Sequence, residues 1–345
     1  MNYELIEKNN KKVFLIDMTK ENNKTFSEIA WKWIKKYINQ NKKIWIIVNK
    51  KWFSTWIICN DCWNIPKCSN CDIPIAYHLD NNGNYFWLCH ICKTQYNEEG
   101  QCSNCWSYEI NKYWYWTERI QQILKKDFNI NSFIVQSETV NSNSKAKNLI
   151  NNLGKNNIII WTSILSRIKK VDFDLIIFLN ADLGLNLPDF NSAYKNFLFL
   201  YEGIKNINCS NFIIQSFNTD SHSIKYAATQ KFEEFKKEEL EFRKNFDYPP
   251  YNNICKIMYK DEIEETLFNK ISELNKELLF LKEKLWFTDI EIYSTPAIIY
   301  KAFNKYRYNI ILKWRNLENF IDIAYWKLKI QQKWFKIDRE PDSLL

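Results

Sequence analysis

Glycine is scarce in this 345-residue sequence, which has 5 glycines where ordinary usage predicts roughly 24. This scarcity excludes glycine-rich linkers and collagen-like repeats. Tryptophan is abundant in contrast, with 15 residues, which is several times its usual share. Glycine and tryptophan together make up about 6% of the chain, close to the usual share of glycine alone.

Long hydrophobic runs are also missing. No apolar run reaches the roughly 18 residues that a bilayer requires, so we expect no membrane-spanning helix. The polar start, MNYELIEKNNKK, lacks the apolar core of a signal peptide, and we therefore expect a cytoplasmic protein. A hydrophobic content of 46% excludes a disordered chain. The net charge of +8 is compatible with a nucleic-acid partner without establishing one.

Cysteine is concentrated in one region of the chain. Two cysteines three positions apart can bind one tetrahedral metal ion, whereas a disulfide between them is strained. Because no secretion signal is expected, zinc is favoured over disulfides. We therefore predict two Zn²⁺ ions, each in a four-cysteine site. The eight predicted ligands form four C-x-x-C pairs, namely Cys59 and Cys62, Cys68 and Cys71, Cys89 and Cys92, and Cys102 and Cys105.

The four pairs can be combined two by two in three ways. A sequential arrangement joins the first pair to the second, and a nested arrangement joins the two inner pairs and the two outer pairs. The inner spacing, C-x2-C-x17-C-x2-C, is typical of a zinc ribbon. We favour nesting, because closure of the inner hairpin brings the outer pairs together. Each four-thiolate zinc site carries about −2, so two sites lower the working charge from +8 to about +4.

Two histidines and the two cysteines outside the C-x-x-C pairs are expected to have structural roles. His78 and His90 lie inside the cysteine-rich region, but eight thiols already fill two tetrahedral sites. Cys209 and Cys255 stand alone and are predicted to be buried free thiols.

The chain outside the cysteine-rich region alternates helical and apolar patterns, which indicates a parallel α/β sheet. Thr25 and Glu28 match a capping box at the start of the first helix. Helices are expected at 25–40, 117–127, 143–153 and 192–205, and strands at 13–18, 44–49, 132–136, 157–161, 174–179 and 211–216.

The last third of the chain follows a different order, typical of an α+β domain with antiparallel strands. A charged helix at 221–246 ends at a Tyr-Pro-Pro-Tyr sequence. Beyond it we expect strands at 254–259, 290–293, 297–303, 307–313 and 334–338, and helices at 262–284 and 316–330. The predicted domains are an α/β domain at 1–50 and 111–218, an inserted zinc module at 51–110, and a C-terminal α+β domain at 219–345.

A set of sequence landmarks resembles the PriA (primosomal protein N′) family of bacterial replication-restart helicases. In order, these landmarks are VNKKWFSTWIICNDCWNIPKCSNCDIPIAYH, LCHIC, CSNC, YWYWTERI, DLIIFLNADLGLNLPDFNSAYKNF, FDYPPYNNICKI and KIDREPDSLL. The resemblance implies a RecA-like second helicase lobe, interrupted by a two-zinc module with nested cysteines and followed by a small α+β domain. It also implies forked or single-stranded DNA, single-strand-binding protein and other primosome proteins as partners.

The sequence departs from this family in its nucleotide motifs. No phosphate-binding G-x-x-x-x-G-K-[ST] motif occurs in it. The family stretch Gly-Thr-Gln-Met-x-Ala-Lys-Gly falls on Trp161–Ile168, and Gln-Val-Ala-Gly-Arg-Ala-Gly-Arg falls on Glu202–Cys209, where both arginines are missing. Asp182 and Asp189 lie in the family's acidic stretch. Because phosphoryl transfer needs groups that position and neutralise phosphates, we assign no catalytic residue and expect no ATP hydrolysis by this chain alone.

A basic and aromatic stretch at 300–308 is the candidate DNA contact. Bases stack on aromatic rings while cations meet phosphates, which suits single-stranded nucleic acid. The structural alternative is an ordinary amphipathic strand with solvated charges. The candidate residues are Lys301, Lys305, Tyr306, Arg307 and Tyr308.

Three functional hypotheses follow. The first is a DNA-binding zinc protein of replication restart and primosome assembly that lacks the ATP-binding lobe and the arginine finger. The second is a subunit of a split, active ATP-dependent 3′–5′ helicase whose front lobe is a separate chain. The third is a zinc-ribbon scaffold for nucleic acid outside replication. None of them involves a membrane.

Seven of the 15 tryptophans occupy positions where the resembling family has glycine. Several of these positions need a positive φ angle or a close backbone approach, which tryptophan disfavours. Independent mutation of all of them to one bulky residue is implausible. We hypothesise that UGA codons meaning glycine were translated as tryptophan. The seven are Trp52, Trp63, Trp106, Trp114, Trp116, Trp161 and Trp314.

Overall fold

The computed structural model describes most of the chain outside the cysteine-rich region. The expected helix at 143–153 lies outside the described residues. The described residues are 2–23, 25–48, 57–59, 68–70, 75–79, 85–88, 94–96, 105–108, 110–112, 116–130, 132–135, 158–161, 172–185, 189–328 and 335–343.

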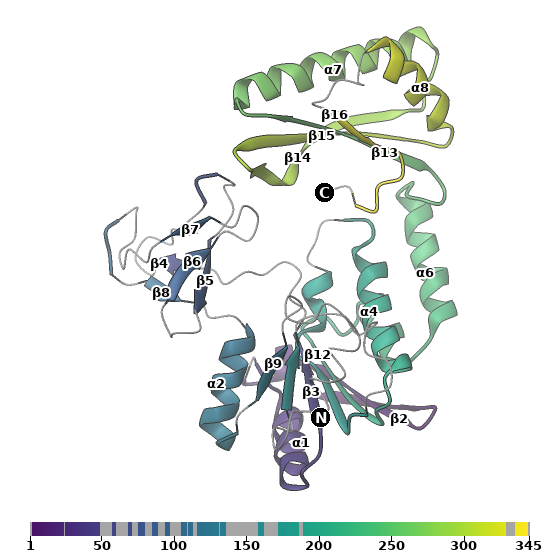
Figure 1. The fold of residues 1–345 in the computed structure, drawn as a ribbon. Coiled ribbons are helices and arrows are strands. Elements are labelled where there is room, and N and C mark those ends of the chain that lie inside the picture. Colours follow the sequence, from purple (N-terminus) through teal and green to yellow (C-terminus); the bar gives the residue numbers. More distant parts are fainter. Residues whose placement is uncertain are drawn as a thin grey trace. The chain divides into compact units, whose positions relative to one another are not determined.

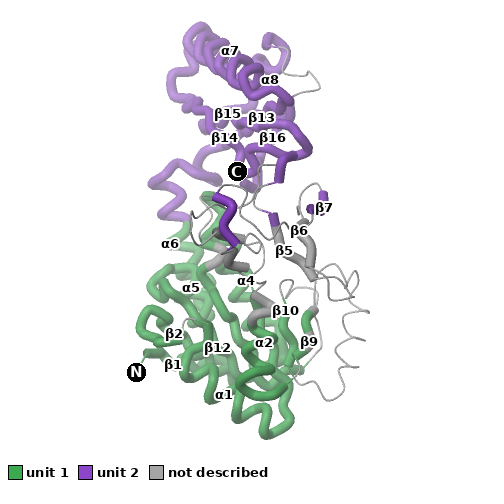
Figure 2. The backbone as a smooth tube through the Cα atoms, turned by 90° about the vertical axis from the view of Figure 1, so that its left-hand side faces the viewer, with its two compact units in different colours: residues 1–53, 114–239 green, residues 54–113, 240–345 purple. Residues whose placement is uncertain are grey.

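The chain divides into two compact units, each built from two separate segments (Figure 2). The first unit comprises residues 1–53 and 114–239, and the second comprises residues 54–113 and 240–345. Position 218, where the sequence suggested a domain boundary, falls inside the first unit. Two helices that follow it, α5 (His222–Ala228) and α6 (Phe232–Asn245), supply side chains to the core of that unit.

The first unit contains a seven-stranded sheet in which six strands are parallel, as the alternating pattern predicted. The edge strand β1 was not predicted, and it runs antiparallel to β2. In spatial order, the strands are β1 (Tyr3–Lys8), β2 (Lys11–Asp17), β12 (Asn211–Ser216), β11 (Leu175–Phe178), β3 (Ile44–Ile47), β10 (Ile158–Trp161) and β9 (Phe133–Val135).

Helices cover both faces of this sheet (Figure 1). One face packs against α1 (Glu28–Asn39) and α2 (Trp116–Phe128), and the other packs against α4 (Ser192–Asn206), α5 and α6. Because successive side chains of a strand point to opposite faces, a strand covered on both sides must be apolar throughout. This explains why every residue of β3 and of β11 is buried.

Two helix boundaries differ from the sequence prediction. The capping box at Thr25 was wrong, because α1 begins after Ser27, whose Oγ accepts a hydrogen bond from the Ala30 backbone N–H at 3.2 Å. The single helix expected at 221–246 is two helices, α5 and α6. The break occurs at Gln230, which adopts a positive φ of 53° and so ends α5.

The C-terminal part of the second unit is a four-stranded antiparallel sheet covered by two helices, as predicted (Figure 1). The strands expected at 290–293 and 297–303 form one strand with a register shift between Pro296 and Lys301. In spatial order, the strands are β14 (Glu291–Ala302), β15 (Lys305–Trp314), β13 (Asn253–Asp261) and β16 (Phe335–Asp338), and the helices are α7 (Glu264–Lys284) and α8 (Leu317–Lys327).

The described residues of the cysteine-rich region include five short strands. Strand β4 (Ile57–Cys59) pairs antiparallel with β8 (Ile110–Lys112). A separate three-stranded sheet contains β5 (Ala76–Leu79), β6 (Tyr85–Leu88) and β7 (Gln95–Tyr96). Among the residues that the structure describes, no helix is both long enough and apolar enough to cross a bilayer.

Candidate metal centre and nucleic-acid interface

The strand pairs of the cysteine-rich region bring distant parts of the chain together. The hairpin β5–β6 places Ala76 opposite Leu88, between the two inner C-x-x-C pairs in the sequence. The pair β4–β8 places Cys59 opposite Ile110, which follows the last C-x-x-C pair. Antiparallel pairing therefore brings the segments next to the two inner pairs near one another, and it does the same for the segments next to the outer pairs. This topology favours the nested arrangement.

Two of the eight predicted ligands have described side chains. Cys68 is buried and Cys105 is exposed. Cys59 ends β4, and the side chains of the other cysteines of this region lie outside the described residues. Among the described side chains, no group of three or more potential ligands lies together. Soft thiolates in C-x-x-C pairs are the donor set that Zn²⁺ prefers. Because most of these cysteines lack described side chains, the two four-cysteine sites stay a prediction.

Tyr96, on β7, contacts the predicted ligand Cys68. Its Oη lies 3.1 Å from Cys68 Sγ and accepts a hydrogen bond from the Ser69 backbone N–H at 3.2 Å. Burial, together with the Cys68 thiol, raises the pKa of Tyr96. A hydroxyl that touches a metal-binding sulfur helps to orient that ligand. The sequence did not indicate this residue, because the contact joins positions 28 apart that no motif relates.

The candidate DNA stretch forms the hairpin β14–β15. Its two-residue turn consists of Phe303 and Asn304, both with positive φ, at 51° and 58°. Two positive φ angles are those of a type I′ turn, whose twist matches that of the flanking strands. Phe303 is 60% exposed at the tip of the hairpin. It was not among the candidate residues, although an aromatic residue in a two-residue turn is a signal that the sequence carries.

The structure separates the five candidate residues into two groups. Tyr306 and Tyr308 pack against the core beneath α7, and the Tyr308 ring centre lies 5.5 Å from that of Phe268 on α7. Lys301, opposite Tyr306, places its Nζ 4.9 Å from the centre of the Tyr306 ring. These contacts are those of an amphipathic strand.

Lys305 and Arg307 lie on the opposite face of the sheet, which α7 does not cover. Arg307 pairs with Lys260 of β13, one position away from the pair of Tyr259, which is buried, and Tyr308, which is partly buried. Alternation along the strands therefore places Lys260 and Arg307 together on the face without helices. Like charges that face each other across strands are destabilising, so this pair favours an anionic partner. Lys305 lies 3.2 Å from Glu262 in an ion pair.

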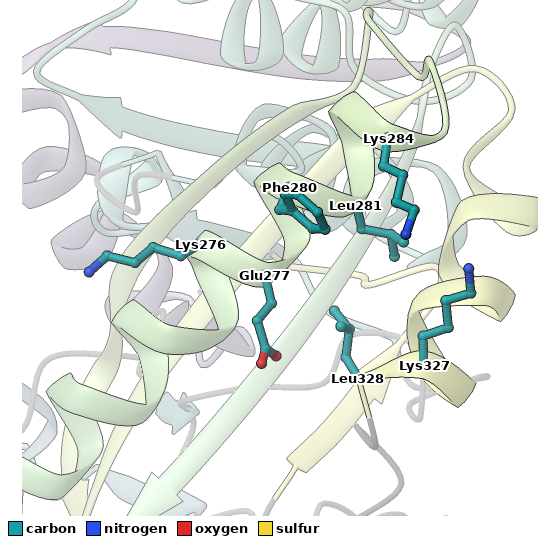
Figure 3. A pocket seen from close by; sticks show the side chains of 7 residues that line it. All are labelled: Lys276, Glu277, Phe280, Leu281, Lys284, Lys327 and Leu328. Carbon is teal, nitrogen blue, oxygen red and sulfur yellow. The ribbon is translucent and has the colours of Figure 1, made fainter.

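A pocket of about 450 Å³ lies on the helical side of the same sheet (Figure 3). It is formed by α7, α8 and the residue that follows α8. Its rim is also basic, which makes it the natural comparison for the helix-free face. The residues that line it are Lys276, Glu277, Phe280, Leu281, Lys284, Lys327 and Leu328.

In the first unit, the carboxyl ends of the parallel strands are where α/β sheets bind ligands. Asp182 lies at this edge after β11 and is buried. Its carboxylate accepts hydrogen bonds from Ser216 Oγ at 2.8 Å, from Phe217 N at 2.7 Å and from Asn218 N at 3.1 Å. Asp189 lies 3.6 Å from the Lys195 ammonium group. Both carboxylates thus have partners within the chain.

The positions of the two family arginines carry no guanidinium group. Asn206 is the last residue of α4, and Cys209 is buried with its Sγ 3.2 Å from the Asn211 carbonyl oxygen, to which it donates. Burial raises the pKa of both Cys209 and Cys255 to about 12. The prediction that these two cysteines are buried free thiols is confirmed.

The known proteins to which this chain is similar include PriA replication restart proteins of several bacteria. The chain is 31% identical over 351 residues to the replication restart protein PriA of Borreliella burgdorferi, a match that covers 96% of this chain and 51% of the relative. It is 26% identical to PriA of Bacillus subtilis, over 96% of this chain and 43% of the relative. For PriA of Thermotoga maritima, the identity is 25%, over 90% of this chain and 41% of the relative. No protein-family profile matches.

The chain spans about half the length of the curated relatives that it matches. The matches nevertheless extend over nearly all of this chain, including the region of the four C-x-x-C pairs and the C-terminal α+β part. The chain is therefore related over almost its whole length to the PriA replication restart proteins, and it resembles the C-terminal half of those proteins.

Proposed function

We propose that this chain is a DNA-binding zinc protein of replication restart and primosome assembly that does not hydrolyse ATP by itself. The observation that carries the proposal is the similarity to PriA over 96% of the chain. The partners that we propose are forked or single-stranded DNA, single-strand-binding protein and other primosome proteins.

The strand pairing of the cysteine-rich region supports the zinc part of the proposal. It brings together the segments next to the two inner C-x-x-C pairs, and likewise those next to the two outer pairs. Cys68 is buried against Tyr96, as a thiolate ligand with a supporting hydroxyl would be. The two Zn²⁺ ions would stabilise this small module, because metal binding contributes directly to the free energy of folding.

The helix-free face of the C-terminal sheet supports the DNA part of the proposal. Lys260 and Arg307 face each other there, and Lys336 on β16 lies opposite Met258, on the same face as both. This group supplies positive charge for phosphates, and the exposed ring of Phe303 supplies a stacking surface for a base.

The proposed lack of ATP hydrolysis rests on missing groups. The sequence has no phosphate-binding loop, and Asn206 and Cys209 stand where the family has arginines. At the edge of the sheet where α/β proteins bind ligands, the Asp182 carboxylate accepts hydrogen bonds from Ser216 Oγ and from the Phe217 N–H. Phosphoryl transfer without a cation that neutralises the developing charge is slower by several orders of magnitude.

DNA binding is tested with fluorescently labelled single-stranded and forked DNA in a salt series. The double variant Lys260→Gln/Arg307→Gln should bind at least about tenfold more weakly, with the slope of affinity against salt reduced by about 2. The matched control is Lys276→Gln/Lys284→Gln, which removes the same charge from the pocket on the helical side. An equal loss in both variants would refute this site, and no binding at low salt would refute the DNA part of the proposal.

The ATPase part is tested with fork DNA, with and without a separately encoded front lobe. We expect no turnover from the chain alone and none from the mixture. DNA-stimulated hydrolysis by the mixture would contradict the proposal and favour the split helicase.

Zinc analysis of the purified chain should give two ions per chain, and a lower content would contradict the eight-ligand assignment.

A further inference from the structure

Helix α7 ends in an unusual way, because a tryptophan occupies a position that favours glycine. Trp286 has a φ of 60°, in the left-handed region. Its N–H donates to the Glu283 carbonyl oxygen at 3.1 Å, and the Phe287 N–H donates to the Lys282 carbonyl oxygen at 3.0 Å. These two bonds define a Schellman motif with Trp286 at the position just past the helix end, where glycine is preferred because it has no Cβ.

Three other helices among the described residues end in the same motif. The residues at the corresponding position are Asn41 after α1, Gln230 after α5 and Asp247 after α6, with φ between 53° and 56°. Asparagine and aspartate tolerate the left-handed region because their short polar side chains bond locally. The tryptophan side chain is neither short nor a polar group of this kind. Within one chain, the same backbone geometry thus carries three polar side chains and one bulky ring.

The environment of Trp286 gives the indole no compensating role. The side chain is 86% exposed. Burial of the ring could offset the free-energy cost of the left-handed backbone through packing, but an exposed ring gives no such stabilisation. Trp106, the residue after Cys105, repeats both features, with a φ of 60° and 73% exposure.

Different properties set the two tryptophans apart. Trp106 was among the seven positions where the resembling family has glycine, whereas Trp286 was not, and only its backbone angle identifies it. Trp161 and Trp314, also among the seven, lie in the strands β10 and β15 without a positive φ, so the backbone makes no demand for glycine there.

We propose that positions 106 and 286 are glycine in the protein that the cell makes, because UGA codons at these positions are decoded as glycine. The proposal accounts for the shortage of glycine together with the excess of tryptophan. It also places glycine where two exposed turns of the chain require positive φ angles. It does not depend on the proposed function.

The direct test combines the coding DNA with the native protein. We expect UGA at both codons, and we expect the peptides that span positions 106 and 286, isolated from the source organism, to have masses with glycine in place of tryptophan. A UGG codon at either position, or a tryptophan-containing peptide, would overturn the proposal.

An independent test measures thermal unfolding of the chain expressed with tryptophan at every position. The variant Trp286→Gly should raise the unfolding midpoint of its unit by about 2–4 °C, because it removes the Cβ from a left-handed residue. Trp286→Ala keeps the Cβ and should leave the midpoint nearly unchanged. Trp326→Gly is the matched control, because Trp326 is also exposed (70%) but lies within α8. It should lower the midpoint. A Trp286→Gly variant that is no more stable than the parent would contradict the required geometry.

Discussion

At the scale of single residues, buried polar side chains join elements that lie far apart in the sequence. Gln215 on β12 is fully buried and makes four hydrogen bonds. Its Nε2 donates to the carbonyl oxygens of Thr25 and Leu179, at 2.9 and 3.1 Å. Its Oε1 accepts from the Ser27 N–H and hydroxyl, at 2.9 and 3.1 Å. One amide therefore holds the start of α1 against the end of β11.

Removal of this amide should be costly for the first unit. Gln215→Ala leaves two carbonyl oxygens and the Ser27 N–H without partners in the interior, and we expect a loss of about 2–3 kcal/mol in the free energy of unfolding. Urea unfolding followed by circular dichroism measures it. The matched control is Gln40→Ala at the exposed end of α1, which should change the same free energy by less than about 0.5 kcal/mol. Equal losses in the free energy of unfolding in the two variants would show that the hydrogen bonds of Gln215 do not stabilise the first unit.

At the scale of elements, the hairpin β14–β15 combines two separable properties in one turn. The backbone at Phe303 is left-handed, which favours asparagine or glycine, whereas the exposed ring of Phe303 offers a surface on which a base can stack. Because Phe303 lies within the basic and aromatic stretch 300–308, its exposed ring is a candidate contact for a base. The structural and functional demands can therefore be tested with one substitution.

Phe303→Asn should separate these demands. Asparagine suits the left-handed position, so the thermal midpoint should be unchanged or higher. If Phe303 stacks on a base, the affinity for single-stranded DNA should fall by about 1–3 kcal/mol, with the salt slope unchanged because no charge is lost. Fluorescence anisotropy and thermal unfolding measure the two effects. An unchanged affinity would remove Phe303 from the interface, and a loss of stability would refute the assigned turn preference.

At the scale of the whole molecule, the ten cysteines divide into a predicted metal-binding set and a buried set. In the proposed zinc module, the metal would protect the first set, because a thiol that loses its metal becomes reactive once its module unfolds. Cys209 and Cys255 depend on the cores of the two units instead. The two sets therefore respond to different perturbations.

Thiol alkylation at neutral pH should distinguish the two sets. The pKa of Cys209 and of Cys255, raised to about 12, keeps both thiols protonated, so neither becomes a nucleophilic thiolate until pH approaches that value or the unit unfolds. The raised pKa contributes stability that is present at neutral pH and is lost as pH rises toward 12. A strong chelator should release eight reactive thiols, and denaturant should then release two more. Eight reactive thiols before chelation would contradict the zinc sites.

Much of the fold was predictable from the sequence, because its signals are local. A run such as Ile44–Ile47 can be stable only where both faces are covered, so it predicts a buried parallel strand wherever it occurs. The break between α5 and α6 was not predictable. Neither glycine nor proline marks it, and Gln230 takes its left-handed angle where the chain turns from one packed helix to the next.

For the candidate site, the sequence predicts a chemistry, and the structure adds contacts that the sequence does not reveal. The spacing of the C-x-x-C pairs identifies soft ligands for two metal ions, but it does not reveal that Tyr96 contacts Cys68. The interleaved charges and rings of 300–308 identify a basic strand, but the pairing with Lys260 depends on which strand lies beside it.

The sequence by itself determined the predicted donor groups, most of the order of helices and strands, and the relationship to PriA, because all three are carried by residue types and their spacing. Only the tertiary structure decided which groups meet. It sorted Tyr306 and Tyr308 toward α7 and Lys305 and Arg307 away from it, since a sheet covered on one face sends alternate residues to opposite environments. It also showed that Trp286 occupies a left-handed position, because a backbone angle is set by the hydrogen bonds that end a helix and not by the residue that stands there.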